Sequence, residues 1–113
     1  MMSISETNVV DVIGIDAPNG IARLAISDHL GWDDPEEEKE HLWILQEKIN
    51  AYLRFIEGGE LYQNYPDAKG AKCEIELVAK YPLSVGGVRF FEQAKTIVQA
   101  AGFELLYRVF TPR

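Results

Sequence analysis

The hydrophobic positions of the chain recur with two different periods, which predict four strands and two helices. Between Cys73 and Tyr81 apolar and polar residues alternate, a pattern typical of a strand with one face in a core and the other in water. Elsewhere apolar residues recur at spacings of three and four, as on the buried face of an amphipathic helix. The predicted strands are 9–15, 21–27, 73–81 and 103–110, and the predicted helices are 35–57 and 88–101.

Residues with special backbone preferences mark the ends of these elements. The segment 16–20 contains a proline, which fixes φ, and an Asn-Gly pair, which accepts positive φ, so it predicts a hairpin turn. Asp34, followed by a proline and then by Glu37, has the composition of a helix N-terminus with a capping box. Gly58-Gly59 supplies a glycine for the left-handed position after the same helix.

The order of the elements, ββαβαβ, predicts an α+β fold. The expected architecture is a two-layer α/β sandwich, in which a four-stranded mixed sheet carries two helices on one face. The first two strands are expected to pair antiparallel, and the close strand–helix–strand sequence 73–110 predicts a parallel crossover. The pattern does not give the strand order. With 113 residues and no linker or repeat, the chain 1–113 is expected to form a single domain.

The charge of the chain is uneven and narrows the classes of partner. The net charge is −7, and the acids gather in residues 1–40, where only Arg23 and Lys39 oppose them. No basic stripe is present to contact phosphates, so nucleic-acid binding is not expected. No apolar run reaches 18 residues and no secretory signal is recognisable, so we expect a cytoplasmic protein without a membrane partner. The single cysteine, Cys73, leaves no internal disulfide.

Seven carboxylates lie between Asp28 and Glu40, at the start of the first predicted helix. Three interpretations stay open. The carboxylates cap the helix and complement its dipole, or they form a docking surface for a cationic partner, or some of them bind a metal. A metal site would use Asp28, His29, Asp33 and Asp34. Because the second histidine, His41, forms only one Glu-x-x-His pair, neither a metal nor a cofactor is predicted.

Catalytic chemistry finds little support in the sequence. Cys73 lies on the apolar side of its strand, where a buried thiol is expected rather than a reactive thiolate. Ser27, Asp28 and His29 are triad residue types, but adjacent residues rarely form a triad because their side chains diverge. Gly86-Gly87 indicates a turn more readily than a phosphate site. The balance is against an enzyme.

Aromatic residues in polar segments predict contact surfaces. Trp32 lies in the acidic segment, and Tyr62 and Tyr65 lie in the long connection 58–71 after the first helix. We expect these three, with Asp28, His29 and Asp33, to bind a ligand or partner. A second apolar stripe on the first helix predicts self-association as a homodimer, and its residues are Trp43, Ile44 and Phe55.

The segments 8–16 and 26–30, the second followed by Trp32, together with 45–52 and 55–59, resemble a family of short uncharacterised bacterial proteins. The resemblance covers nearly the whole chain. It implies a stand-alone bacterial domain of unknown function and assigns no catalytic residue.

Together these features predict a small acidic protein that acts as a non-catalytic binding or interaction module, through self-association or through a protein partner. One alternative is a neutralising, immunity-type protein that masks a basic partner. The other is a small metal-dependent enzyme. Steep loss of binding with salt would favour the first alternative, and bound metal in the purified protein would favour the second.

Overall fold

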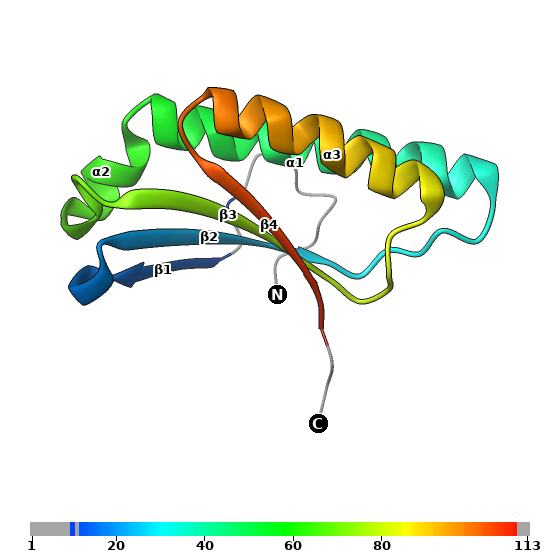
Figure 1. Cartoon of the computed structure of the whole chain (residues 1–113), viewed down its shortest axis with the longest axis horizontal. Helices are drawn as coiled ribbons and strands as arrows, with labels where there is room; N and C mark the ends of the chain where they lie inside the picture. The colour runs from blue at the N-terminus through cyan, green and yellow to red at the C-terminus, as the bar shows by residue number, and fades with distance from the viewer. Residues whose placement is uncertain (1–9, 11, 111–113) are drawn as a thin grey trace.

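The computed structural model describes residues 10 and 12–110 and has two layers (Figure 1). A four-stranded sheet of order β1-β2-β3-β4 forms one layer, and the long helices α1 and α3 lie together on one of its faces. The predicted α+β architecture is confirmed, and the predicted order ββαβαβ holds for the strands and the two long helices; the short helix α2 was not predicted. The elements are β1 (Val12–Asp16), β2 (Ile21–Asp28), α1 (Pro35–Glu57), α2 (Glu60–Asn64), β3 (Lys72–Ala79), α3 (Val85–Ala100) and β4 (Glu104–Val109), with 3-10 turns at Ala17–Asn19 and Pro66–Ala68.

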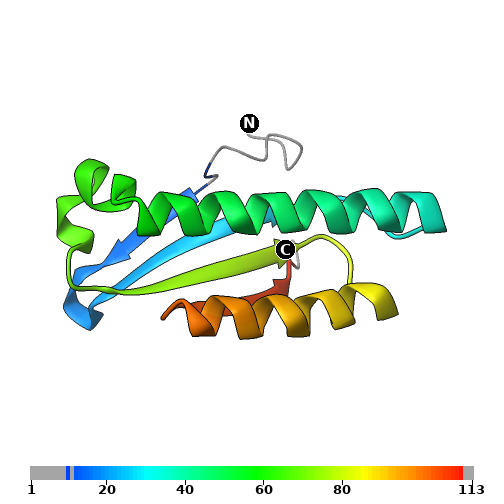
Figure 2. The ribbon, with the colours of Figure 1, turned by 90° about the horizontal axis from the view of Figure 1, so that it is seen from above.

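The sheet is mixed, and its register aligns the core residues of neighbouring strands. β1 and β2 pair antiparallel through the predicted turn, where Gly20 has a φ of +68°. β2 pairs parallel with β3, and β3 pairs parallel with β4. Leu24, Ile75 and Leu105 therefore lie side by side, one from each parallel strand. Each parallel step is made by one long helix, and α1 and α3 lie next to each other above the sheet (Figure 2).

The hydrophobic core lies between the helices and the sheet. The central strands of the sheet contribute alternate residues to the core, as the sequence pattern predicted for β3. The helix α1 contributes the largest share from one element, including Leu45, Tyr52 and Ile56. The Tyr52 hydroxyl donates a 2.6 Å hydrogen bond to the backbone carbonyl of Ala25, so this buried polar group is satisfied.

The helix α1 begins and ends as its sequence predicts. The Asp34 carboxylate accepts a 2.8 Å hydrogen bond from the Glu37 backbone N–H, and Pro35 occupies the first helical position. After Glu57 the chain turns at Gly58, and Gly59 takes a φ of +86°. A residue with a Cβ is strained at that φ, so glycine is needed here.

The helix α3 begins three residues earlier than predicted. Ser84 is its N-cap, and the Ser84 hydroxyl accepts a 3.0 Å hydrogen bond from the Gly87 N–H, which places Gly86 and Gly87 in the first turn. Ile97 is apolar and follows the buried Ala94 by three residues, but it is 61% exposed. Only a narrow arc of α3 is buried in the core, at Gly87, Ala94 and Val98. The reason is that α3 lies at one side of the sheet, beside α1 (Figure 2).

The predicted first strand began at Val9, which lies outside the described residues, as does position 11 within it. Among residues 10 and 12–110, none of the helices has the apolar length that a bilayer crossing requires.

Candidate binding site at the start of α1

The connection between β2 and α1 lies at the end of the sheet where the parallel strands β2 and β3 both finish. We call residues 28–34 the acidic loop. In Figure 1 it runs beside the β3–α3 connection, because parallel strands bring their carboxyl ends to one edge. A backbone hydrogen bond of 2.7 Å, from the Lys80 N–H to the Asp28 carbonyl, joins the two connections.

A buried hydrogen-bonded pair forms the base of the acidic loop. The Asp28 Oδ2 and His41 Nε2 atoms are 2.6 Å apart, and each side chain is only 1% exposed. The Asp28 Oδ1 atom accepts a 3.1 Å hydrogen bond from the Leu30 N–H. The His41 Nδ1 atom lies 3.0 Å from the backbone oxygen of Gly31. Asp28 and His41 thus hold the loop at two successive residues.

The partners of His41 determine where its protons lie. The Gly31 carbonyl can only accept, so the Nδ1 atom of His41 carries a hydrogen and donates it. Two acceptors would repel each other at 2.6 Å, so one proton also lies between His41 Nε2 and Asp28 Oδ2. Every polar atom of the imidazole is therefore used to hold the fold.

Trp32 covers this pair. Its ring stacks on the His41 ring, with centroids 3.7 Å apart and planes inclined by 22°. A Cβ atom at Gly87 would lie 3.2 Å from the Trp32 Cη2 atom, so glycine in the first turn of α3 lets the indole pack closely. Within the described part of the chain, the buried indole nitrogen of Trp32 has no hydrogen-bond partner. The indole acts as an apolar cover over the pair.

An open pocket of about 500 Å³ lies against the acidic loop. Leu30, Gly31 and Trp32 are half-buried lining residues. Polar side chains from the acidic loop, from α1 and from the β3–α3 connection also line the pocket, and we call them its rim. His29 and Asp33 are exposed, Glu37 is half-buried, and Tyr81 is 44% exposed. The lining residues are His29, Leu30, Gly31, Trp32, Asp33, Glu37 and Tyr81.

The rim side chains lie close to one another. A Cβ at Gly31 would be 3.1 Å from the Glu37 carboxylate, which would have to shift, and 3.9 Å from the Tyr81 ring, which is an ordinary van der Waals contact. The Lys80 ammonium lies 5.4 Å from the centroid of the Tyr81 ring, within the range of a cation–π contact. The Tyr81 ring therefore already accepts a cation on one face.

The structure separates the residues that were predicted to form one contact surface. His29, Trp32 and Asp33 line one pocket, whereas Asp28 is buried next to them and bonds to His41. Tyr62 and Tyr65 lie beyond the opposite end of α1, whose 23 residues span about 34 Å. A contact surface that includes Trp32, Tyr62 and Tyr65 would have to extend along the whole of α1, and it stays a prediction.

Tyr62 and Tyr65 differ from each other in their surroundings. Tyr62 packs on the core, and its hydroxyl lies 3.8 Å from the Cys73 sulfur. Burial raises the pKa of the Tyr62 hydroxyl, and the contact with Cys73 raises it further. Burial also raises the pKa of the Cys73 thiol, against the opposing effect of the Tyr62 hydrogen bond. Tyr65 is 40% exposed and lies between the two short helical segments.

The predicted self-association stripe is divided by the fold. Ile44 is only 7% exposed and belongs to the core, so its assignment to an exposed stripe is wrong. Phe55 is half-buried against the same core, whereas Trp43 is 58% exposed. The physical reason is that α1 packs beside α3 as well as on the sheet, so more than one stripe of the helix is covered (Figure 2).

The sequence interpretation missed His41, Glu37 and Tyr81 as members of the site. His41 precedes Leu45 by four residues, on the stripe that continues to Tyr52 and Ile56, so its position on the helix is the signal of burial. Tyr81 had no comparable signal, because its place depends on the pairing of β2 with β3.

The described residues contain no group of three or more His, Cys, Asp or Glu side chains placed to hold a metal ion. The alternative metal site of Asp28, His29, Asp33 and Asp34 is therefore not assembled. Asp28 turns inward to His41, and Asp34 caps α1.

Comparison with known proteins supplies a family and no described activity. The curated proteins and the solved structures contain no significant match to this chain. A family model matches residues 2–111, which is nearly the whole chain. The chain therefore belongs to DUF6572, a family of unknown function.

Proposed function

We propose that this protein is a non-catalytic binding module that recognises a cationic segment of a protein partner at the acidic-loop pocket. The observation that carries the proposal is the construction of the pocket. The buried chain from Asp28 through His41 to Gly31 fixes the loop, and the rim then presents carboxylates and an aromatic ring to solvent.

The geometry favours binding over catalysis. Asp28 and His41 are the residue types of an acid–base pair, but both are buried and both ring nitrogens of His41 are engaged. A general base needs access to the proton that it removes. Cys73 is buried on β3 with a raised thiol pKa, which lowers the fraction of reactive thiolate.

The charge of the rim favours a cationic ligand. Asp33 and Glu37 line the pocket, and three further carboxylates of the same helix start are close in the sequence: Asp34, Glu36 and Glu38. The N-terminus of α1 opposes them with a dipole charge of only about +0.5. The summed formal charge of the five carboxylates is about ten times the dipole charge. One of the five, Asp34, also caps the helix. The net field at the pocket is therefore negative and attracts ammonium or guanidinium groups.

The aromatic rings add shape to this attraction. A cation over an exposed aromatic face gains roughly 0.5–1 kcal/mol, and the Lys80 ammonium over one face of the Tyr81 ring supports the use of this ring in such a contact. A partner's arginine has a planar group that can stack on the ring while it pairs with a carboxylate. Arginine is therefore expected to bind better than lysine.

The proposal can be tested with short peptides and NMR. Tetra-arginine, tetra-lysine and tetra-glutamate are titrated separately into the protein, and backbone amide shifts are followed. We expect tetra-arginine to shift residues 28–34, Glu37 and Tyr81, tetra-lysine to do so more weakly, and tetra-glutamate to have no effect. The affinity should fall when salt is raised from 20 to 200 mM, because the contact is exposed to solvent.

A matched pair of variants separates the pocket from general acidity. Asp33→Asn with Glu37→Gln removes two charges at the pocket, and Glu57→Gln with Glu60→Gln removes two at the far end of α1. We expect the first pair to weaken tetra-arginine binding about tenfold and the second to change it less than twofold. Equal losses in both pairs, or shifts spread over the whole helix, would contradict the proposal.

A further inference from the structure

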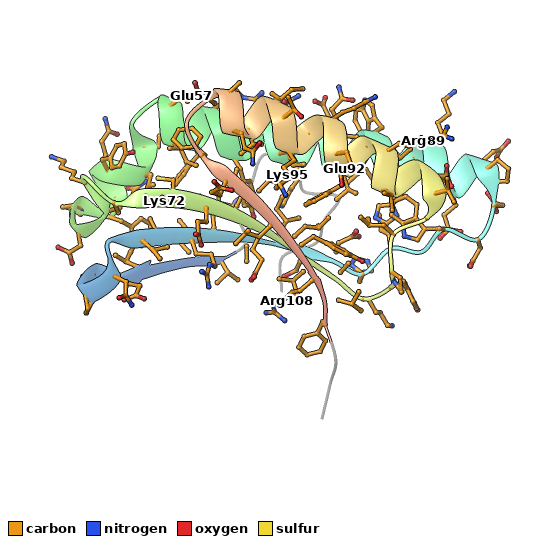
Figure 3. The ribbon with its side chains drawn as sticks, in the orientation of Figure 1. Glu57, Lys72, Arg89, Glu92, Lys95 and Arg108 are labelled. Carbon is orange, nitrogen blue, oxygen red and sulfur yellow. The ribbon has the colours of Figure 1, made fainter. Side chains whose placement is uncertain are left out.

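We infer that two copies of this chain associate through the face of the sheet opposite the helices. In Figure 1 no described element lies on that face, which we call the open face. The side chain of Arg108 projects from β4 on this side, away from α1 and α3 (Figure 3). The inference does not rest on the proposed function, because the acidic-loop pocket lies at the end of the sheet and on other residues.

The topology is the first reason to expect a cover. β2, β3 and β4 are parallel neighbours, and sheets whose strands are all parallel occur almost only where both faces are covered. An antiparallel sheet commonly leaves one face in water, but here only the β1–β2 pair is antiparallel. Three of the four strands of this mixed sheet therefore follow the arrangement in which both faces are usually covered, which supports a cover on the open face.

The open face also carries apolar side chains. Val12 is 56% exposed, and Val78 and Leu106 are only partly covered by their neighbours. The strand register places these residues on the same side of the sheet, because Val12 pairs with Ala25 and Val78 pairs with Arg108. Apolar residues on three strands thus share one surface.

Charge balance indicates which partner suits this face. Its strand residues include four acids and three bases, so it is nearly neutral although the whole chain carries −7. A basic or an acidic partner would gain little net attraction there. A second copy meets least repulsion on this face, since most of the excess acid lies elsewhere. The charged residues are Asp16, Glu74, Glu76, Glu104, Arg23, Lys72 and Arg108.

The central charges are already paired within one copy. Arg23 donates to Glu74 from both Nε and Nη2, at 3.0 and 2.7 Å, and Arg108 Nε lies 3.4 Å from the Glu76 carboxylate. The bond to Glu74 and the negative charge there raise the pKa of the Arg23 guanidinium. Covering the face therefore removes water from formed pairs rather than from single charges, which costs much less than burial of an unpaired ion.

The register makes the face complementary to itself. Arg23 and Glu74 are direct neighbours across β2 and β3. A two-fold axis along the strands, between β2 and β3, exchanges these positions, so Arg23 of one copy faces Glu74 of the other. The same axis exchanges β1 with β4 and brings Val12 opposite Leu106. Two aligned sheets commonly pack face to face in this way.

The size of the face sets the expected strength. Four strands at a spacing of about 4.8 Å and a length of about 20–26 Å give roughly 450 Å² of flat area for each copy. The two copies together bury about 900 Å², just below the roughly 1,000 Å² of a stable specific interface and in the range of weak ones. We therefore expect a weak dimer with a Kd of about 10–100 μM.

Sedimentation velocity from 10 μM to 1 mM protein tests the inference. The unmodified protein should pass from monomer to dimer in this range. Val12→Glu places a charge on the open face and should weaken the dimer about tenfold or more. Ile97→Glu, at a residue of similar exposure on α3, is the matched control and should leave the dimer unchanged. Circular dichroism confirms that both variants are folded.

Charge exchange tests the register. Arg23→Glu and Glu74→Arg should each be monomeric alone, since like charges then face each other across the two-fold axis. When the two variants are mixed, opposite charges face each other at both symmetric positions, and a heterodimer should form. A protein that is monomeric at 1 mM would overturn the inference, as would a dimer that Ile97→Glu weakens as much as Val12→Glu. A Val12→Glu variant that unfolds would show that the chain itself covers the face, and this too would overturn it.

Discussion

At the scale of single residues, Asp28 and His41 show how a polar pair inside a core fixes a loop. Taking such a pair out of water is costly, and its mutual attraction often only offsets that cost. Its value lies in specifying one arrangement, since each group also binds loop backbone, at Leu30 and at Gly31. The pair thus sets the conformation that places Trp32 over it.

This role predicts different losses for similar substitutions. His41→Ala or Asp28→Ala leaves the other group buried without its partner, which should lower the free energy of unfolding by about 3–5 kcal/mol. Asp28→Asn should cost only about 1 kcal/mol, because the amide oxygen still accepts from Leu30 and the amide nitrogen donates to a neutral His41. Urea unfolding measures all three. If Asp28→Asn is as damaging as Asp28→Ala, the negative charge rather than the hydrogen-bond geometry is what matters.

Cys73 and Tyr62 predict how stability changes in alkaline solution. Burial raises the pKa of both above their ordinary values of 9.0 and 10.0, and the folded protein therefore keeps both protonated longer than the unfolded chain does. The unfolded state releases these protons first, so their stabilising effect is complete below pH 9 and is lost as the pH rises above it. Unfolding free energies from pH 7 to 10.5 should fall more steeply for the natural protein than for a Cys73→Ala, Tyr62→Phe variant. Parallel curves would show that neither group is linked to folding.

Some core residues could be predicted from the sequence, and two important ones could not. The alternation of β3 gave Cys73, Ile75 and Leu77 as buried, which is confirmed. His41 and Lys48 lie on the buried stripe of α1, at 1% and 0% exposure, although their residue types are usually placed outside. At these positions the residue type predicts exposure and the helical periodicity predicts burial. For His41 the buried position depends on a tertiary partner, Asp28, which the sequence does not reveal.

At the scale of elements, the N-cap of α1 can be tested apart from its charge. Asp34→Ala removes the acceptor for the Glu37 N–H and should cost about 1 kcal/mol. Asp34→Asn keeps an acceptor and relieves repulsion with neighbouring carboxylates, so it should change stability by less than about 0.5 kcal/mol. Asp33→Ala, at an exposed residue that does not cap α1, is the control and should also be close to neutral. Denaturant midpoints measure the series. An Asp34→Ala variant no less stable than Asp33→Ala would show that the cap contributes nothing.

Elements that are marked by residues near each other in the sequence were predicted well. Features that depend on contacts between distant segments were missed. α1 has a cap, a proline and a terminal glycine, and its bounds agree with the prediction. The prediction placed the start of α3 at residue 88 because Val85, Gly86 and Gly87 are poor helix formers. The helix starts at Val85 because the Ser84 cap and the contact with Trp32 outweigh that preference. The strand order β1-β2-β3-β4 leaves no trace in periodicity, because alternation reports which face is buried and not which strand is adjacent.

At the scale of the whole molecule, the distribution of charge separates the two proposed interactions. The acidic loop and the first turns of α1 hold seven carboxylates between Asp28 and Glu40, whereas the open face of the sheet is nearly neutral. Binding of a cation at the pocket is a contact between opposite charges. Association of two copies brings together two molecules of net charge −7.

Salt should therefore move the two interactions in opposite directions. At 20 mM salt the screening length is about 20 Å and at 200 mM it is about 7 Å, so two acidic copies repel each other less at the higher concentration. The pairs of the open face, such as Arg23 with Glu74, exist before association, and their screening changes the dimer little. We expect the dimer Kd from sedimentation to fall severalfold between these concentrations while the Kd for tetra-arginine from NMR rises by a similar or larger factor. A dimer that weakens with salt as steeply as peptide binding does would mean that the copies meet through opposite charges, for example the acidic loop of one copy and a basic surface of the other, and not through the open face.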